Sequence, residues 1–391
     1  MLLSIPLAWL QLIHQRVRFV ATIIGIALVV ALLFMQLGFQ DALFNSAVRV
    51  HESLKGDLFM ISAQYKSLTA QQFFPRRRLY QTLASDQVKS VSPLYMQFAK
   101  LKNIETGQKY SVFIFGIDLG ESPFELPEIQ KSLDVLKFPN KTLFDRYSRA
   151  EFGPIVERFE QGQPVAIEVS TFNEITLARR YEVAGLFGLG TSFGIDGSMI
   201  VNGSAYLHTF RGNDPNEISI GIINLADAAD IKAVQAKLQQ SFPQDVQILT
   251  RQEFIALEKS YWNLRTPVGF TFKIMVTFGF CVGIGVAYQV LYTNISAHLM
   301  EYATLKAVGF RNLYLLSTVF QQAIILAFLG FIPGLIIATG IYDQARTATN
   351  LPMLMTVNKA YTVLISVIAM CAVSGMLAIQ KLRSADPADI F

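Results

Sequence analysis

The chain has 391 residues and a formal net charge of +4, and 52% of the residues are hydrophobic while only 16% are charged. A soluble domain carries about 25% charged residues, so a large part of this chain is expected inside a membrane. The small net charge argues against a nucleic-acid surface, and the two cysteines, Cys281 and Cys371, lie in apolar segments and cannot build a disulfide framework.

Four apolar segments are long enough to be transmembrane helices, each of which needs about 20 residues. We predict spans at residues 19–40, 267–293, 312–342 and 360–381. A cleaved signal peptide is the alternative for the first span. Its apolar core exceeds the usual length of about 7–15 residues, and no clear small-x-small cleavage site follows it.

The orientation follows from basic residues near the span ends, because these residues favour the cytoplasmic side. They cluster in three regions: Arg16 and Arg18, Lys306 and Arg311, Lys381 and Arg383. We therefore predict cytoplasmic segments at residues 1–18, 294–311 and 382–391, with both termini inside the cell. A short loop at 343–359 and the long segment 41–266 are predicted to lie outside, in the periplasm.

The long external segment, residues 41–266, has the composition of a water-soluble domain. Short runs such as SVFIFGI and PVAIEVS are rich in β-branched or aromatic residues and bounded by turn residues, which is typical of strands. Helical patterns such as ADIKAVQAKLQQSF lie between them. We predict an α+β extracytoplasmic domain with two lobes.

Both ends of this domain are predicted to be helical and to form a stalk on the membrane helices. The first span continues without proline up to Pro75. At the other end, Thr250 and Glu253 match a capping box, with Thr as the N-cap and Glu as the third helical residue. The alternative is that these are ordinary surface helices of the domain.

Two further motifs lie in the external segment. The glycine-rich run GLFGLGTSFGIDG at residues 185–197 lacks GxGxxG spacing, so a turn-rich hairpin is favoured over a phosphate cradle. The basic run Arg76, Arg77 and Arg78 is typical of solvated surface, and contact with a partner or an anionic lipid is the alternative.

Two common catalytic signatures are absent from the sequence. No Gly-Lys dipeptide occurs, so there is no P-loop, and HExxH is not present. The four histidines are scattered, which argues against a metal site. We predict no catalytic residue, no metal and no cofactor on this chain, so any energy source must come from another subunit.

A charged island, SAHLMEYATLKAVGFRN, separates the second and third spans. Ser296 is predicted to cap a helix and Gly309 to end it. The island is too long for a simple turn, so we predict a short cytoplasmic helix lying along the membrane, with Glu301 and Lys306 left to meet water or protein.

The island carries a family resemblance. Its E-x-x-x-L-K-A-x-G pattern resembles the coupling helix of MacB/FtsX-type ABC-transporter permeases, and YEVAGLFGLGTSFGIDGSMIVN is similar to their cyanobacterial DevC-like branch. The order of one span, a large external domain, three spans and a short tail also resembles this family. Met300 and the pair Tyr302-Ala303 depart from the usual pattern of Arg before the Glu and Ile-Gly after it. The resemblance assigns ATPase docking to these residues: Glu301, Tyr302, Leu305, Lys306, Ala307 and Gly309.

The resemblance also implies partners and a mechanism. The chain would be a homodimeric permease in the bacterial inner membrane, served by a cytoplasmic ABC ATPase that binds ATP and Mg²⁺. A periplasmic membrane-fusion adaptor would connect it to an outer-membrane duct, and the motion would drive efflux of a lipid-like or amphiphilic substrate. Pro333 and Gly334 are predicted to form a hinge in the third span. The alternatives are an FtsX-like signalling permease that activates a cell-wall hydrolase and a lipoprotein-release permease.

Overall fold

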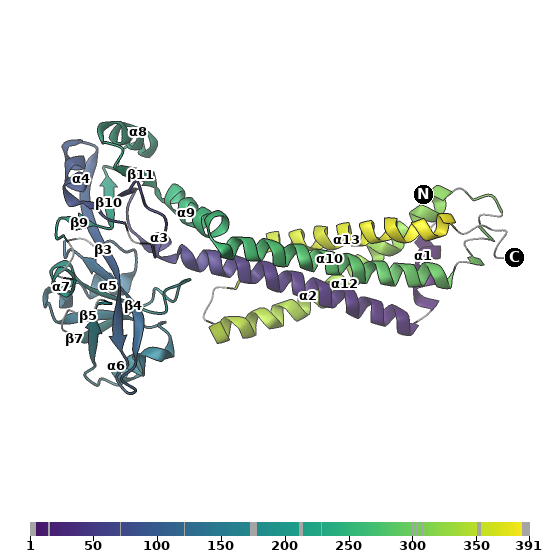
Figure 1. Cartoon of the computed structure of the whole chain (residues 1–391), viewed down its shortest axis with the longest axis horizontal. Coiled ribbons are helices and arrows are strands. Elements are labelled where there is room, and N and C mark those ends of the chain that lie inside the picture. The colour runs from purple at the N-terminus through teal and green to yellow at the C-terminus, as the bar shows by residue number, and fades with distance from the viewer. Residues whose placement is uncertain are drawn as a thin grey trace. The chain divides into compact units, whose positions relative to one another are not determined.

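The chain folds into two compact units. The computed structural model describes residues 5–14, 16–70, 72–120, 122–172, 178–210, 214–227, 229–298, 300–301, 304–305, 308–310, 312–349 and 353–384. Residues 1–42 and 267–391 form one unit, here called the helical unit, and residues 43–266 form the other, here called the sheet unit (Figure 1). The predicted external segment, residues 41–266, covers nearly the same stretch as the sheet unit.

The helical unit is built from long apolar helices. Its named helices are α1 (Ile5–His14), α2 (Arg16–Ala47), whose last residues belong to the sheet unit, α10 (Pro267–Ala297), α12 (Asn312–Thr349) and α13 (Val357–Ser384). Among the described residues, four stretches are long and apolar enough to cross a membrane: Arg16–Ala47, Pro267–Ala297, Ser317–Thr347 and Val357–Ala378. The predicted number of four membrane-spanning helices is therefore confirmed, whereas helix α1 had no counterpart in the prediction.

The predicted loop at residues 343–359 is largely helical instead. Helix α12 continues to Thr349 and α13 begins at Val357. Residues 341–349 contain neither proline nor glycine, so the sequence offers no signal that would end the helix where its apolar part ends. The start of α13 is fixed by an ion pair, in which Lys359 Nζ lies 3.1 Å from Asp41 Oδ2 of α2.

Helix α12 packs closely against α2 through two glycines, Gly330 and Gly334. A Cβ atom at Gly330 would clash with Ile26 Cγ2, and one at Gly334 would lie 2.6 Å from Val30 Cβ and 2.8 Å from Ala27 O. Small residues four positions apart let two membrane helices approach to backbone contact. This pair therefore sets how close the two spans lie.

The sheet unit combines strands with short helices. Its strands are β1 (Leu58–Ser62), β2 (Phe74–Pro75), β3 (Val88–Lys102), β4 (Lys109–Ile117), β5 (Lys141–Asp145), β6 (Ala166–Ser170), β7 (Arg179–Phe187), β8 (Ser198–Asn202), β9 (Glu217–Ile218), β10 (Ile220–Leu225) and β11 (Val246–Thr250). Its helices are α3 (Arg49–Ser53), α4 (Arg76–Gln81), η2 (Thr82–Ala84), α5 (Pro127–Lys131), η3 (Val135–Lys137), η4 (Ala150–Phe152), α6 (Ile155–Glu160), α7 (Gly203–Thr209), α8 (Ile231–Ser241), α9 (Arg251–Ser260) and the π-helix η5 (Tyr261–Arg265). The predicted α+β class is confirmed.

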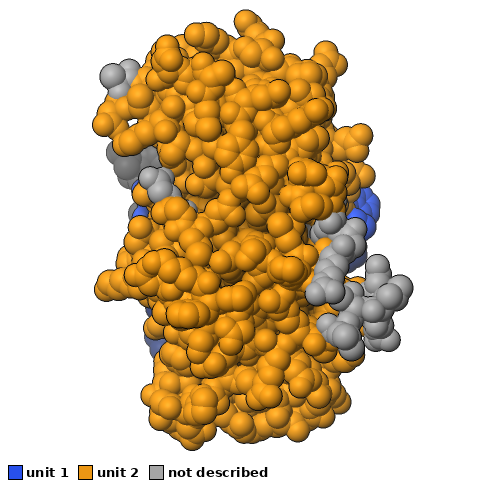
Figure 2. Space-filling model, turned by 90° about the vertical axis from the view of Figure 1, so that its left-hand side faces the viewer, with its two compact units in different colours: residues 1–42, 267–391 blue, residues 43–266 orange. Residues whose placement is uncertain are grey.

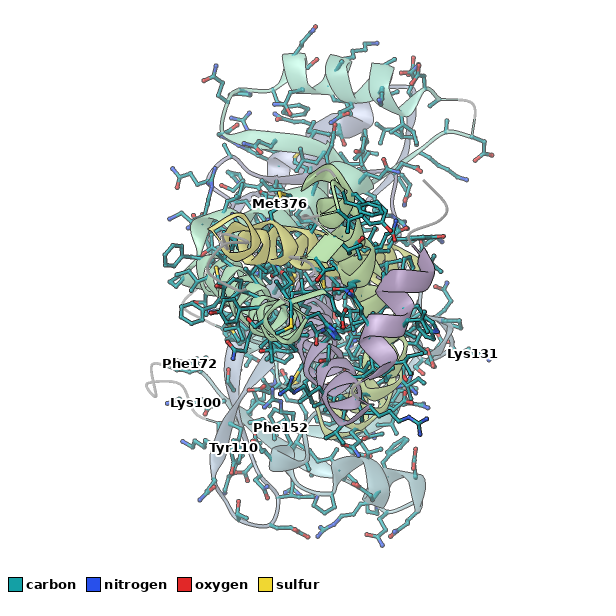
Figure 3. All side chains as sticks on the ribbon, turned by 90° about the vertical axis from the view of Figure 1, so that its right-hand side faces the viewer. Lys100, Tyr110, Lys131, Phe152, Phe172 and Met376 are labelled. Carbon is teal, nitrogen blue, oxygen red and sulfur yellow. The ribbon has the colours of Figure 1, made fainter. Side chains whose placement is uncertain are left out.

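One long strand, β3, joins two lobes of this unit. In the described residues the sheet order is β11-β1-β10-β3-β4-β8-β5-β7-β6, and β6 also pairs with the end of β3. The first part of β3 pairs with β10 and the second part with β4, so the second lobe closes into a ring of strands. The face of the sheet unit in Figure 2 is correspondingly longer than it is wide. At the closure, Lys100 Nζ of β3 lies 5.3 Å from the centre of the Phe172 ring (Figure 3).

Both faces of the sheet are buried. Alternate residues of β1 point to opposite faces, so Leu58 and Met60 lie in one hydrophobic core while Phe59 and Ile61 lie in another. The elements α3 and α9, which lie at the two ends of the sheet unit's chain, contribute Val50 and Phe254 to the second core. The chain ends of this unit are thus anchored on one face of the sheet.

Candidate functional site

The charged island begins differently from its prediction. Helix α10 continues to Ala297, so Ser296 lies inside the last turn of this helix and is not an N-cap. Its Oγ donates a hydrogen bond to Tyr292 O at 2.7 Å. A serine hydroxyl can bond back to the preceding turn as readily as it caps a new helix, which explains why the predicted cap is wrong.

The island itself is helical where it is described, and it ends at a glycine. Residues 300–301 and 304–305 are in helix, and Gly309 has a φ of +99°. Phe310 N donates to Leu305 O at 3.0 Å, which is the bond that closes a helix end when the preceding residue is left-handed. Gly309 therefore ends the island helix as predicted, while Tyr302, Lys306 and Ala307 lie outside the described residues.

A chain of polar side chains connects the island to two other helices of the helical unit. Gln322 Nε2 of α12 donates to Gln11 Oε1 of α1 at 2.9 Å, and Gln11 Nε2 donates to Glu301 Oε2 at 3.0 Å. The other carboxylate oxygen, Oε1, lies 3.0 Å from His298 Nδ1. Gln322 and Gln11 are buried, but the side chain of Glu301 is 56% exposed. We call these four residues the Glu301 network.

The Glu301 carboxylate is both partly exposed to solvent and hydrogen-bonded to other helices. Its exposed part remains accessible to another protein, as the sequence predicted. Its oxygens are also bonded to a buried amide that continues to the third span, which the sequence did not indicate. Hydrogen bonds thus join Glu301 to α1 directly and to α12 through Gln11.

The predicted hinge residues have unequal surroundings. Pro333 lies inside the continuous helix α12, where it removes one backbone hydrogen bond. Gly334 is in contact with α2 at Val30 and Ala27, as described above. This glycine supplies room for a neighbouring helix, a reason that the sequence alone did not reveal.

The predicted capping box is present at the start of α9. Thr250 Oγ1 accepts a hydrogen bond from Glu253 N at 3.3 Å, and Glu253 Oε2 accepts one from Thr250 N at 2.9 Å. The bond from Thr250 N lowers the pKa of Glu253. Gln235 Nε2 of α8 donates to the same carboxylate oxygen at 2.6 Å. The cap thus also attaches α9 to the neighbouring helix α8.

The basic run on α4 is mostly engaged within the sheet unit. Arg76 Nη2 lies 3.1 Å from Asp118 Oδ2, and Arg78 Nη2 lies 2.9 Å from Asp245 Oδ2. Arg77 is exposed. Since two of the three cations already have carboxylate partners, Arg77 is the one best placed for an external anion.

The glycine-rich run contains a tight turn, in which an antiparallel bridge joins Ser192 to Ile195. The flanking strands β7 and β8 do not pair with each other, because both pair with β5, which lies between them in the sheet. The intervening loop is tied down by Asp145, whose carboxylate accepts hydrogen bonds from Leu189 N at 3.2 Å and Gly190 N at 2.8 Å. Arg49 of α3 donates to Thr191 O at 3.0 Å. Burial raises the pKa of Asp145. Gly190 has a φ of +87°, a left-handed conformation that favours glycine, and a Cβ atom there would clash with the Arg49 guanidinium.

A buried carboxylate, Glu258 of α9, has no counterpart in the sequence analysis. Its side chain is 1% exposed, yet it accepts hydrogen bonds from Tyr65 Oη at 3.0 Å, Leu68 N at 3.0 Å and Trp262 Nε1 at 2.9 Å. His51 Nε2 of α3 lies 3.5 Å from Glu258 Oε2. Burial raises the pKa of Glu258 to about 7 and lowers that of His51 to about 3. The donors are up to 193 residues away, so no local pattern could have indicated this cluster.

In the described part of the chain, no three His, Cys, Asp or Glu side chains are grouped as a metal site requires.

Comparisons with known proteins cover nearly the whole chain. A family model described as the MacB-like periplasmic core domain matches residues 19–241, and one described as the FtsX-like permease C-terminal matches residues 273–387. Among curated proteins no match was found.

The solved structures that are similar to this chain include two extracytoplasmic regions. One is the periplasmic region of MacB from Actinobacillus actinomycetemcomitans, with 11% identity and a TM-score of 0.35, covering 52% of this chain and 92% of that one. The other is the extracellular domain of the noncanonic ABC-type transporter YknZ from Gram-positive bacteria, with 17% identity and a TM-score of 0.33, covering 50% of this chain and 99% of that one.

Proposed function

This chain belongs to the family of MacB-like and FtsX-like ABC-transporter permeases, and we propose that it is the membrane subunit of an exporter driven by a separate ATPase. Membership of the family implies a multi-pass membrane protein with an ABC ATPase as its partner. The finer assignments are proposals: a DevC-like branch, the bacterial inner membrane, cytoplasmic termini and a homodimer. ATP and Mg²⁺ would be bound by the ATPase and not by this chain.

The observation that carries the proposal is the Glu301 network. An exposed carboxylate on a short helix between two spans is bonded through Gln11 to Gln322 inside the membrane helices. An ATPase that moves this helix would therefore move several spans together. The docking surface is the one named from the sequence, from Glu301 to Gly309.

We further propose that the motion is used outside the membrane. Residues 19–40, 274–292, 313–342 and 360–378 contain no charged side chain, so the spans lack the groups that line most ion and proton pathways. Force transmitted along α2 and α10 to the sheet unit would instead drive a lipid-like or amphiphilic substrate through an adaptor and an outer-membrane duct.

The test is purification of the full chain from native membranes after cross-linking. An exporter should bring down an ABC ATPase together with a membrane-fusion adaptor, and the chain purified alone should hydrolyse no ATP. Recovery of a cell-wall hydrolase in place of the adaptor would point to a signalling permease. Acylated lipoproteins without an outer-membrane duct would point to lipoprotein release.

A further inference from the structure

The two connections of the sheet unit meet at one buried carboxylate. Helix α3 begins two residues after the end of α2, and the π-helix η5 ends two residues before the start of α10. Glu258 lies on α9, which leads directly into η5. Its partners come from α3, from the segment after β1 and from η5.

The contacts at Glu258 link these segments to one another and not only to the carboxylate. Tyr65 Oη lies 3.0 Å from Glu258 Oε2 and 3.3 Å from His51 Nε2. The His51 ring also packs edge-on against Phe254, one turn before Glu258, with 4.3 Å between the ring centres. Glu258 Oε1 is held by the indole of Trp262 on η5.

Burial of the Glu258 carboxylate costs free energy, so the site must supply hydrogen-bond donors to it. A buried carboxylate is tolerated only when donors surround it, and removing it leaves Tyr65, Leu68 and Trp262 with unsatisfied polar groups. An apolar residue in the same place would fill the core without joining the segments. Glu258 therefore stabilises the core less than an apolar residue would, but its hydrogen bonds join α9 to the neighbouring segments in a fixed geometry.

We propose that Glu258 is a positioning residue that ties α3 to α9 and η5, so that a displacement of either connection is shared by both. The inference rests on the proposed function in one respect, namely that such displacements originate at the membrane helices. The link itself is a property of the sheet unit and can be tested without an ATPase.

The first test uses the indole of Trp262 as a reporter. The chain has two tryptophans, so Trp9→Phe leaves Trp262 alone in the full-length protein.

Titratable groups that face Glu258 are His51 and Tyr65. His51 is neutral above pH 3, and burial and Glu258 raise the pKa of Tyr65 well above its usual value. A change in Trp262 emission with a midpoint near pH 7 is therefore expected from Glu258, and it should vanish in Glu258→Gln. Tyr65→Phe removes a donor to the carboxylate and should move the midpoint upward.

The second test is hydrogen exchange of the full chain in detergent, comparing Glu258→Leu with the wild type. Exchange at the Glu52 amide of α3 and at the Leu68 amide should rise about tenfold, because the link between the segments is gone. Gln252→Ala is the matched control, since this residue is exposed on the same helix, and it should leave both amides unchanged.

Two results would overturn the inference: Trp262 emission that does not respond to pH between 5 and 9, or wild-type exchange at Glu52 in a folded Glu258→Leu protein. Failure of the proposed function would look different. In that case the link would be measured as described, but the chain purified from cross-linked native membranes would bring down no ABC ATPase.

Discussion

At the scale of single residues, Glu258 makes the stability of the sheet unit depend on pH. Its carboxyl group has an ordinary pKa of 4.5, and burial raises the pKa to about 7 in the folded protein. The unfolded chain therefore releases this proton first, and folding becomes less favourable as pH rises. The stabilisation is fully present below pH 4.5 and is lost as pH rises through 7.

We expect urea unfolding of the sheet unit, followed by Trp262 emission, to show a loss of about 3 kcal/mol between pH 4.5 and 7.5 from this group. In Glu258→Gln that component should disappear, since the amide does not titrate. Equal pH slopes for the two proteins would contradict the assignment.

Glu301 allows a second prediction at this scale. Glu301→Lys removes the acceptor of the Gln11 hydrogen bond and places a cation beside His298. We expect the variant to assemble with the ATPase but to uncouple ATP hydrolysis from movement of the sheet unit. The measurement is the ATP-dependent distance between labels in the sheet unit, taken alongside the ATPase rate. Glu301→Gln keeps an acceptor in place and serves as the control, and normal coupling in the Lys variant would contradict the prediction.

The sequence predicted the position of Glu301 but not its partners. Its exposure follows from the local helix pattern, whereas Gln11 is 290 residues away and belongs to a helix that was not expected. Glu258 was missed for the same physical reason. Hydrogen bonds between distant segments depend on how the elements pack, and periodicity within one segment carries no information about that.

At the scale of elements, contact between α12 and α2 depends on the two glycines of α12. Gly334→Ala would place a Cβ atom 2.6 Å from Val30 Cβ and 2.8 Å from a backbone oxygen that cannot move aside. We expect this clash to lower the free energy of unfolding by about 1–3 kcal/mol. The melting temperature of the detergent-solubilised protein should fall accordingly.

The matched control for this change is Gly340→Ala on the same helix. A Cβ atom there meets nothing within 4 Å, and alanine favours helix over glycine by about 1 kcal/mol. The control should be neutral or slightly more stable. If both variants melt alike, the close approach of α12 and α2 is not required for stability.

Element boundaries were predictable only where the signal was local. The capping box at Thr250 and Glu253 lies within four residues and was found. Ser296 carries the same kind of signal, but its hydroxyl bonds to the preceding turn because α10 has not yet ended. The tight turn within residues 185–197 is local and is present, whereas the flanking strands do not pair because β5, which is distant in sequence, lies between them.

At the scale of the whole molecule, topology is open to direct labelling. In a background without Cys281 and Cys371, Gln252→Cys should react with an impermeant maleimide added to intact cells. Ala297→Cys should react only after the membrane is opened. Both positions are exposed, so accessibility reports the side of the membrane. Labelling of Ala297→Cys from outside would contradict a cytoplasmic island.

The number of spans and the α+β class were predictable. Both depend on the length of the apolar segments and on the spacing of hydrophobic residues, which can be read directly from the sequence. The order of strands was not. In the described sheet β3 pairs with β10, β4 and β6, and these partners come from widely separated segments. Only the folded arrangement shows that β3 is the strand shared by both lobes.

The pairing of the first and last strands has a consequence for the history of this architecture. β1 runs beside β11 over its whole length, with Leu58 opposite Thr250 and Ser62 opposite Val246. A domain whose two chain ends lie side by side can be inserted into a loop of another protein without distorting that protein. We infer that a single insertion would suffice to add this domain to a protein made of membrane helices alone.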